Sequence, residues 1–242
     1  MEALKNLFRK NKSIPTENTF ERDGKITPDQ FVAAGDQLID KCPAWRWAAG
    51  EPSKALQYLP PGKQFLITQR VPCRKRASSL LTRAEESEVE GDGGDSWLVP
   101  ESAVATPDAA TPASGAAAAG GAAHRTYDVC ITYDIFYQSP RMWLLGYAED
   151  GTTLLTQEQV FEDISEDHAR KTVTIEQHPH LGVPYATIHP CKHASLMKRF
   201  IDRLAQENKG LNPTHYFFQF LKFMNAVIPT IEYGMTVEME SL

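Results

Sequence analysis

Several protein classes are excluded by what the chain lacks. No apolar run approaches the ~20 residues that a membrane-spanning helix needs, and the N-terminus has no continuous apolar stretch of a secretory signal. Positive charge is scarce, because 25 Lys and Arg against 31 Asp and Glu give a formal net charge of −6, which argues against a general nucleic-acid binder. The four cysteines lie far apart, which argues against a secreted disulfide scaffold. We therefore expect a protein of a reducing cytosolic or nuclear setting, and of these we favour the cytoplasm.

The order of the periodic segments is typical of an α+β protein. The sequence TPDQ at 27–30 supplies an N-cap, a first-turn proline and a capping-box glutamine for a helix that ends before Pro43. Apolar residues at helical spacing predict two more helices near the C-terminus, over 190–204 and 212–228.

Strands are predicted between these helices. Strands are expected over 63–71, 127–134, 141–150 and 171–178, and the segments 127–134 and 171–178 show the alternation that is typical of a strand. The segment 156–164 is the only helical or irregular piece among them. Because the connections within the second half are short, we expect a four-stranded antiparallel meander flanked by helices.

A low-complexity insertion interrupts this pattern over 76–124. It is first basic and then acidic, and eleven of the 23 residues from 101 to 123 are alanine. Such a composition buries too little apolar surface to offset the entropy of ordering, which predicts disorder. Trp97 and Leu98 follow the acidic run, a pattern suited to adding a strand to a partner's sheet edge, with incidental packing as the alternative.

The first 14 residues combine apolar and basic side chains at helical spacing. Leu4, Leu7 and Phe8 form the apolar part, and Lys and Arg outnumber the single acid. A short basic amphipathic helix of this kind binds an anionic membrane interface. The alternative is a solvated terminus.

One short sequence carries chemistry: IHPCKHASLMKRF, residues 188–200. Proline at the first helical position places Cys191 in a first turn, where free N–H groups and the helix dipole favour a thiolate. Three interpretations stay open: a nucleophile with a histidine base, a structural cysteine that caps a helix, and a zinc ligand. A zinc site could use His189 and His193 with His178 or His180. The base could be His178 or His180, because His189 and His193 lie too close to Cys191 along the chain.

Several long motifs resemble one family. RTYDVCITYD, PRMWLLGYAEDG, FEDISEDHARKTVTIEQHPHL, IHPCKH and FLKFMNAVIPTIEY, with ITPDQFVAAGDQLIDKCPAWRWAAG and YLPPGKQFLITQRVPC before the insertion, are similar to the autophagy-related conjugating enzymes that attach a ubiquitin-like modifier to phosphatidylethanolamine. The resemblance covers most of the chain outside the insertion. It implies a ubiquitin-conjugating-like fold, with one catalytic domain formed by 24–75 and 125–242, a partner-docking linker at 76–124 and a membrane-contact segment at 1–14.

The resemblance also implies roles for residues and partners. The family's active cysteine lies in its HPC motif, so Cys191 would receive the modifier as a thioester from an activating enzyme and pass it to the lipid amine. Ubiquitin-conjugating relatives support the oxyanion with an asparagine near the cysteine, whereas His189 and Pro190 precede Cys191 here. Support must then come from backbone N–H groups or another side chain. His189 would orient or protonate groups, and Thr172 would help to set the geometry of the site.

No cofactor and no metal are implied. The expected partners are the modifier, its activating enzyme, a phosphatidylethanolamine-containing membrane that the protein visits transiently, and a scaffold complex that stimulates transfer. Nucleic acid is not among them. The alternative function is a non-enzymatic adaptor that keeps the fold and binds autophagy partners through its linker.

Overall fold

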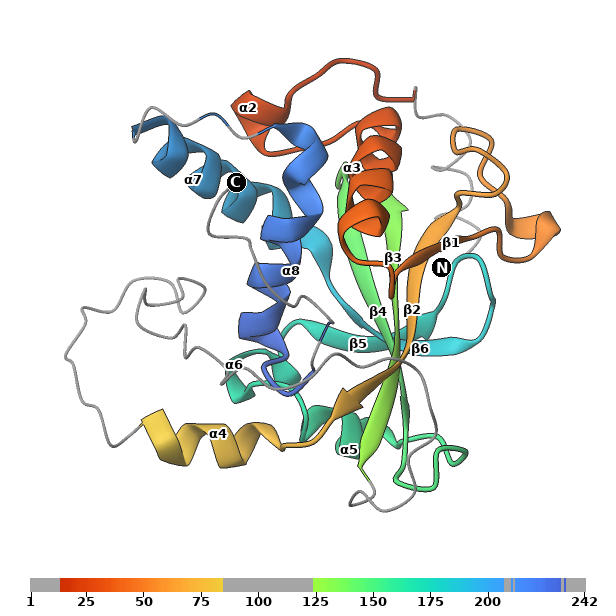
Figure 1. Cartoon of the computed structure of the whole chain (residues 1–242), viewed down its shortest axis with the longest axis vertical. Coiled ribbons are helices and arrows are strands. Elements are labelled where there is room, and N and C mark those ends of the chain that lie inside the picture. The colour runs from red at the N-terminus through yellow and green to blue at the C-terminus, as the bar shows by residue number, and fades with distance from the viewer. Residues whose placement is uncertain (1–13, 85–123, 207–209, 211, 232, 234–242) are drawn as a thin grey trace. The chain divides into compact units, whose positions relative to one another are not determined.

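The computed structural model describes residues 14–84, 124–206, 210, 212–231 and 233 (Figure 1). They fall into two compact units. The first unit contains the described parts of Met1–Gln69, Val129–Leu144 and Thr174–Phe220, and the second contains those of Arg70–Asp128, Leu145–Val173 and Leu221–Leu242. Four strands and one helix contribute residues to both units. No helix among these residues is long and apolar enough to cross a bilayer.

A six-stranded sheet has the strand order β1-β2-β3-β4-β6-β5. Its strands are β1 (Arg46–Ala48), β2 (Phe65–Cys73), β3 (Arg125–Asp134), β4 (Ser139–Tyr147), β5 (Val173–Gln177) and β6 (Pro184–Ile188). β1 pairs antiparallel with β2, and β4 pairs antiparallel with β6. The sheet and the surrounding helices confirm the predicted α+β class.

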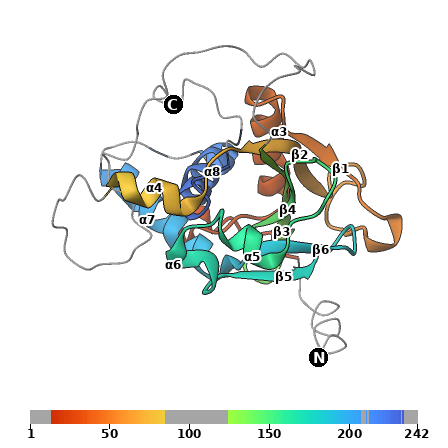
Figure 2. The same ribbon diagram turned by 90° about the horizontal axis from the view of Figure 1, so that it is seen from below.

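The predicted four-stranded meander needs correction. Its strands are present as β2, β3, β4 and β5, but the sheet has two more, and β6 lies between β4 and β5. Figure 2 shows β6 beside β5. The additional strands carry weak local signals, because β1 has only three residues and β6 begins with a proline.

α3 (Pro28–Lys41) begins where the sequence places its cap, whereas the two α-helices expected to start at Pro190 and Pro213 begin three residues later. In α3 the Thr27 side chain accepts the Gln30 N–H, and the Gln30 side chain accepts the Thr27 N–H. Near the C-terminus, α7 (His193–Gln206) and α8 (Tyr216–Val227) each follow a short 3₁₀ turn, η3 (Pro190–Lys192) and η4 (Pro213–His215). The shorter helices are α2 (Phe20–Asp23), η1 (Pro52–Lys54), α5 (Gln157–Phe161) and α6 (Glu166–Ala169).

The start of the predicted linker is helical. Residues Ala77–Ala84 form α4, whose first residue is buried and donates its N–H to the carbonyl of Glu162 at 2.9 Å. Alanine and leucine have high helix propensity, and the buried Ala77 anchors the helix within the second unit. Residues 85–123 of the predicted linker, with Trp97 and Leu98, lie outside the described residues, as do the predicted membrane-contact residues Leu4, Leu7 and Phe8.

Candidate active site

Cys191 lies between a buried strand and a long helix in the first unit. β6 ends at Ile188, η3 follows, and α7 begins at His193. Pro190 is buried, whereas the Cys191 side chain is exposed. Cys73 and Cys130 are buried. The thiol at 191 is therefore open to a large reaction partner, and it lies in a three-residue 3₁₀ turn instead of the predicted first α-helical turn.

His189 contacts groups on both sides of its ring. It is the N-cap of η3, and its Nδ1 accepts the backbone N–H of Cys191 at 3.3 Å. Its Nε2 lies 3.4 Å from the Tyr137 hydroxyl, and the two rings meet edge to face with centroids 5.2 Å apart. Because Nδ1 accepts a hydrogen bond, a neutral ring carries its proton on Nε2. The predicted orienting role of His189 stays a prediction. The Cys191 N–H already has an acceptor within the protein, the Nδ1 of His189.

Tyr137 was missed by the sequence analysis. It lies in the turn between β3 and β4, where Asp134 Oδ1 accepts the N–H of Phe136 at 2.9 Å and that of Tyr137 at 3.2 Å. Partial burial raises the pKa of Tyr137, and the charge of a Cys191 thiolate adds to the increase. The hydroxyl therefore keeps its proton at neutral pH. The sequence signal that could have found Tyr137 is the aromatic pair that it forms with Phe136 in a short turn. Phe136 is 67% exposed in the structure.

His193, the first residue of α7, is buried. Its side chain is 2% exposed, and its Nδ1 lies 2.9 Å from the carbonyl oxygen of Pro140. Its ring packs edge to face on Phe220, with centroids 5.4 Å apart. Burial lowers the pKa of His193 to about 4, so the ring is neutral at neutral pH and Nδ1 is the donor to the carbonyl.

The other two candidate histidines belong to the core of the first unit. The rings of His178 and His180 lie 4.9 and 5.3 Å from the ring of Phe65. His178 Nδ1 accepts the His180 N–H at 3.3 Å, and burial lowers the pKa of His178 to about 3. Within the part of the chain that the structure describes, no group of three or more His, Cys, Asp or Glu side chains could hold a metal ion.

Thr172 lies immediately before β5 and belongs to the second unit. It is half-buried, and its hydroxyl donates to the carbonyl oxygen of His168 at 3.3 Å. Its expected role at the thioester stays a prediction.

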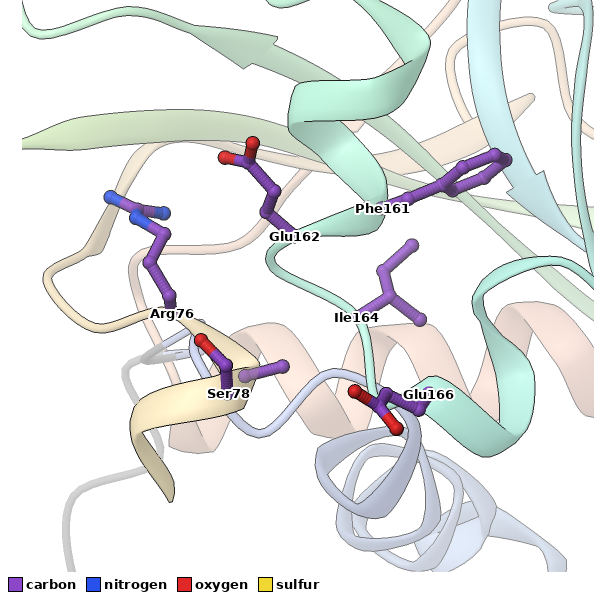
Figure 3. A pocket seen from close by; sticks show the side chains of 7 residues that line it. Arg76, Ser78, Phe161, Glu162, Ile164 and Glu166 are labelled. Carbon is purple, nitrogen blue, oxygen red and sulfur yellow. The ribbon is translucent and has the colours of Figure 1, made fainter. Parts of the chain in front are cut away.

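A pocket of about 400 Å³ lies in the second unit (Figure 3). It is lined by Arg76, Ala77, Ser78, Phe161, Glu162, Ile164 and Glu166. Arg76 forms an ion pair with the buried Asp163, so its charge already has a partner in the protein. The lining therefore offers mostly acidic and apolar groups.

The sequence is similar to a known protein family along most of its length. Residues 30–235 match the family described as "Autophagocytosis associated protein, active-site domain". The chain is 35% identical to autophagy-related protein 3 of Dictyostelium discoideum, with 95% of each chain covered. It is 38% identical to the protein of that name from Arabidopsis thaliana, over 99% of this chain and 96% of the relative. The corresponding protein of Yarrowia lipolytica is 33% identical, over 93% of this chain and 74% of the relative.

Proposed function

Because the chain belongs to the autophagy-related protein 3 family, we propose that it is a cysteine-dependent transferase that conjugates a ubiquitin-like autophagy modifier to phosphatidylethanolamine. The observation that carries this function is the exposed thiol of Cys191, in the HPC sequence that the resemblance identifies as the active motif. A sheet of this kind followed by two helices supports a ubiquitin-conjugating-like fold.

The reaction has two acyl transfers. In the first, the Cys191 thiolate attacks the thioester carbonyl of the modifier on its activating enzyme, so that a new C–S bond forms and the activating enzyme's thiolate leaves. In the second, the lipid amine attacks the Cys191 thioester. A C–N bond forms, the C–S bond breaks, and the proton lost by the amine balances the thiolate that becomes the Cys191 thiol. Neither step requires a cofactor.

A charging assay tests this function. The full chain is mixed with the activating enzyme, the modifier and ATP, and the thiol-sensitive adduct is measured on a non-reducing gel. We expect an adduct for the wild type, a more stable oxyester for Cys191→Ser and no adduct for Cys191→Ala. An undiminished adduct on Cys191→Ala would refute the site. If the wild-type protein forms no adduct, the result would favour the non-enzymatic adaptor function.

The lipid substrate requires that the protein reach a membrane. We propose that residues 1–14 supply transient membrane binding through Leu4, Leu7 and Phe8. We also propose that the otherwise cytoplasmic protein meets the activating enzyme through its linker, with Trp97 and Leu98 as contacts, and that a scaffold complex stimulates transfer. Apolar burial by so few residues gives weak, reversible binding. Flotation with small anionic vesicles should be lost when all three apolar residues are replaced by Asp. Unchanged flotation would remove the segment from the proposal.

We propose that Thr172 helps to set the geometry of the thioester. The variant Thr172→Val removes the hydroxyl and keeps the branched shape. It should slow transfer to the amine and leave charging of Cys191 intact. Transfer at the wild-type rate would exclude the role.

A further inference from the structure

Tyr137, His189 and Cys191 form a connected set in the first unit. His189 accepts the Cys191 N–H with one ring nitrogen, and its other ring nitrogen lies 3.4 Å from the Tyr137 hydroxyl. Tyr137 comes from the β3–β4 turn, whereas His189 and Cys191 come from the junction after β6. One imidazole ring therefore places a hydroxyl group in the neighbourhood of the reactive thiol.

The tautomer of His189 decides what that hydroxyl group can do. Since Nδ1 accepts from Cys191, Nε2 is the protonated atom of the neutral ring and donates to the Tyr137 oxygen. A tyrosine hydroxyl that accepts this bond still has its own O–H to donate. The O–H of Tyr137 is thus available for a group bound at Cys191.

We propose that Tyr137 donates a hydrogen bond to the acyl oxygen of the thioester on Cys191 and stabilises the oxyanion that forms when the amine attacks. This role rests on the proposed function. When the C–N bond forms, the carbonyl π electrons move to oxygen, and they return when the C–S bond breaks and the Cys191 sulfur leaves. Tyr137 keeps its proton throughout. His189 acts as a positioning residue, because it orients the hydroxyl and does not touch the reacting carbonyl.

The surroundings of Tyr137 suit a preorganised donor, which is the property that makes oxyanion stabilisation effective. Asp134 fixes the turn through two backbone N–H groups, and the Ile26 N–H donates to the Gln138 carbonyl at 2.9 Å. The raised pKa of Tyr137 keeps the O–H protonated at neutral pH, when it must donate. The site thus gains a side-chain donor at the point where Cys191's own N–H is occupied.

Single-turnover discharge tests the proposal. Wild type and Tyr137→Phe are charged to completion, activation is stopped by removing magnesium, and ethanolamine is added over a range of concentrations. We expect equal charging, a maximal discharge rate lower by about fivefold or more for Tyr137→Phe, and an unchanged half-saturating amine concentration. A smaller loss overturns the proposal. Failure of the wild type to charge would instead refute the proposed function, and this role with it.

A matched control and a double variant sharpen the test. Tyr147→Phe removes another hydroxyl, one that donates to Asp128 at 3.2 Å, and should discharge at the wild-type rate. His189→Asn keeps a side-chain oxygen to accept the Cys191 N–H but cannot reach Tyr137 at the same time. It should slow discharge, and Tyr137→Phe/His189→Asn should be no slower than the slower single variant. Losses that multiply would show that the two residues act independently and would overturn the positioning role of His189.

Discussion

His193 Nδ1 donates a hydrogen bond of 2.9 Å to the carbonyl oxygen of Pro140. His193 lies two residues after Cys191, and Pro140 lies three residues after Tyr137. The bond therefore joins the beginning of α7 to the beginning of β4, the two elements that flank the candidate site. Because the ring is buried and well packed, this contact fixes the turn that carries Tyr137 relative to the thiol.

The exposure of the cysteines predicts the order of their alkylation. Cys191 is exposed, Cys73 and Cys130 are buried, and burial raises the pKa of Cys42 and of Cys73. A limiting amount of iodoacetamide at neutral pH should modify Cys191 before the other three, because the exposed thiol reacts without an opening of the fold. Peptide mass spectrometry measures the order, and denatured protein, with all four accessible, is the control. Early labelling of Cys73 or Cys130 would contradict the burial.

A buried carboxylate should contribute strongly to stability in the second unit. Asp163 is fully buried, accepts the Tyr127 hydroxyl at 2.5 Å and lies 3.3 Å from the Arg125 guanidinium, and Arg76 also pairs with it. Asp163→Asn removes the charge and leaves two arginines without their buried partner. We expect a loss of about 3–5 kcal/mol in the free energy of unfolding, measured by urea denaturation.

The neighbouring Glu162 is the matched control. Its carboxylate pairs with Arg125 at 2.8 Å, but its side chain is 54% exposed. An exposed ion pair contributes about 0–1 kcal/mol, so Glu162→Gln should change stability by no more than that. Equal effects of Asp163→Asn and Glu162→Gln would show that burial does not govern this network.

Gly24 should tolerate no side chain. It ends α2 in the left-handed conformation, with φ of 67°, and a Cβ there would lie 2.2 Å from the carbonyl oxygen of Ala194 in α7. Gly24→Ala adds backbone strain to a steric clash, and we expect a loss of about 2–4 kcal/mol in urea denaturation. Gly62→Ala, where a Cβ meets nothing within 4 Å, is the control and should change stability by about 0.5 kcal/mol or less. A stable Gly24→Ala protein would refute the close approach of α2 and α7.

The features that local sequence determines were the ones predicted correctly. The capping box of α3 joins Thr27 and Gln30, which are three residues apart, so its pattern can be recognised in the sequence. The pairing of Tyr137 with His189 joins residues 52 positions apart, and only the sheet brings them together. β6 was missed because its position between β4 and β5 depends on the same long-range pairing. Motif resemblance singled out Cys191, but it could not show that His189 accepts the backbone N–H of Cys191.

Buried histidine predicts acid sensitivity with a definite sign. The pKa of His193 is lowered to about 4, mainly by burial, against about 6.5 in an unfolded chain. The unfolded state therefore binds the proton more readily, so the stabilising contribution is complete above pH 6.5 and is lost as pH falls towards 4. By pH 5 the loss from this residue is about 2 kcal/mol. His178, whose pKa is lowered to about 3, adds a loss of the same sign.

The variant His193→Asn distinguishes the contribution of His193 to acid destabilisation from that of the other titratable groups. Its amide keeps a donor for the Pro140 carbonyl but has no proton to gain, while His178 and every carboxylate remain. Urea denaturation at pH 7.5 and pH 5.0 should show a decrease in the free energy of unfolding that is about 2 kcal/mol smaller for the variant than for the wild type. An identical decrease in both proteins would mean that the His193 ring is not held neutral by burial. The hydrogen bond between His193 and the Pro140 carbonyl would then not be sensitive to pH in this range.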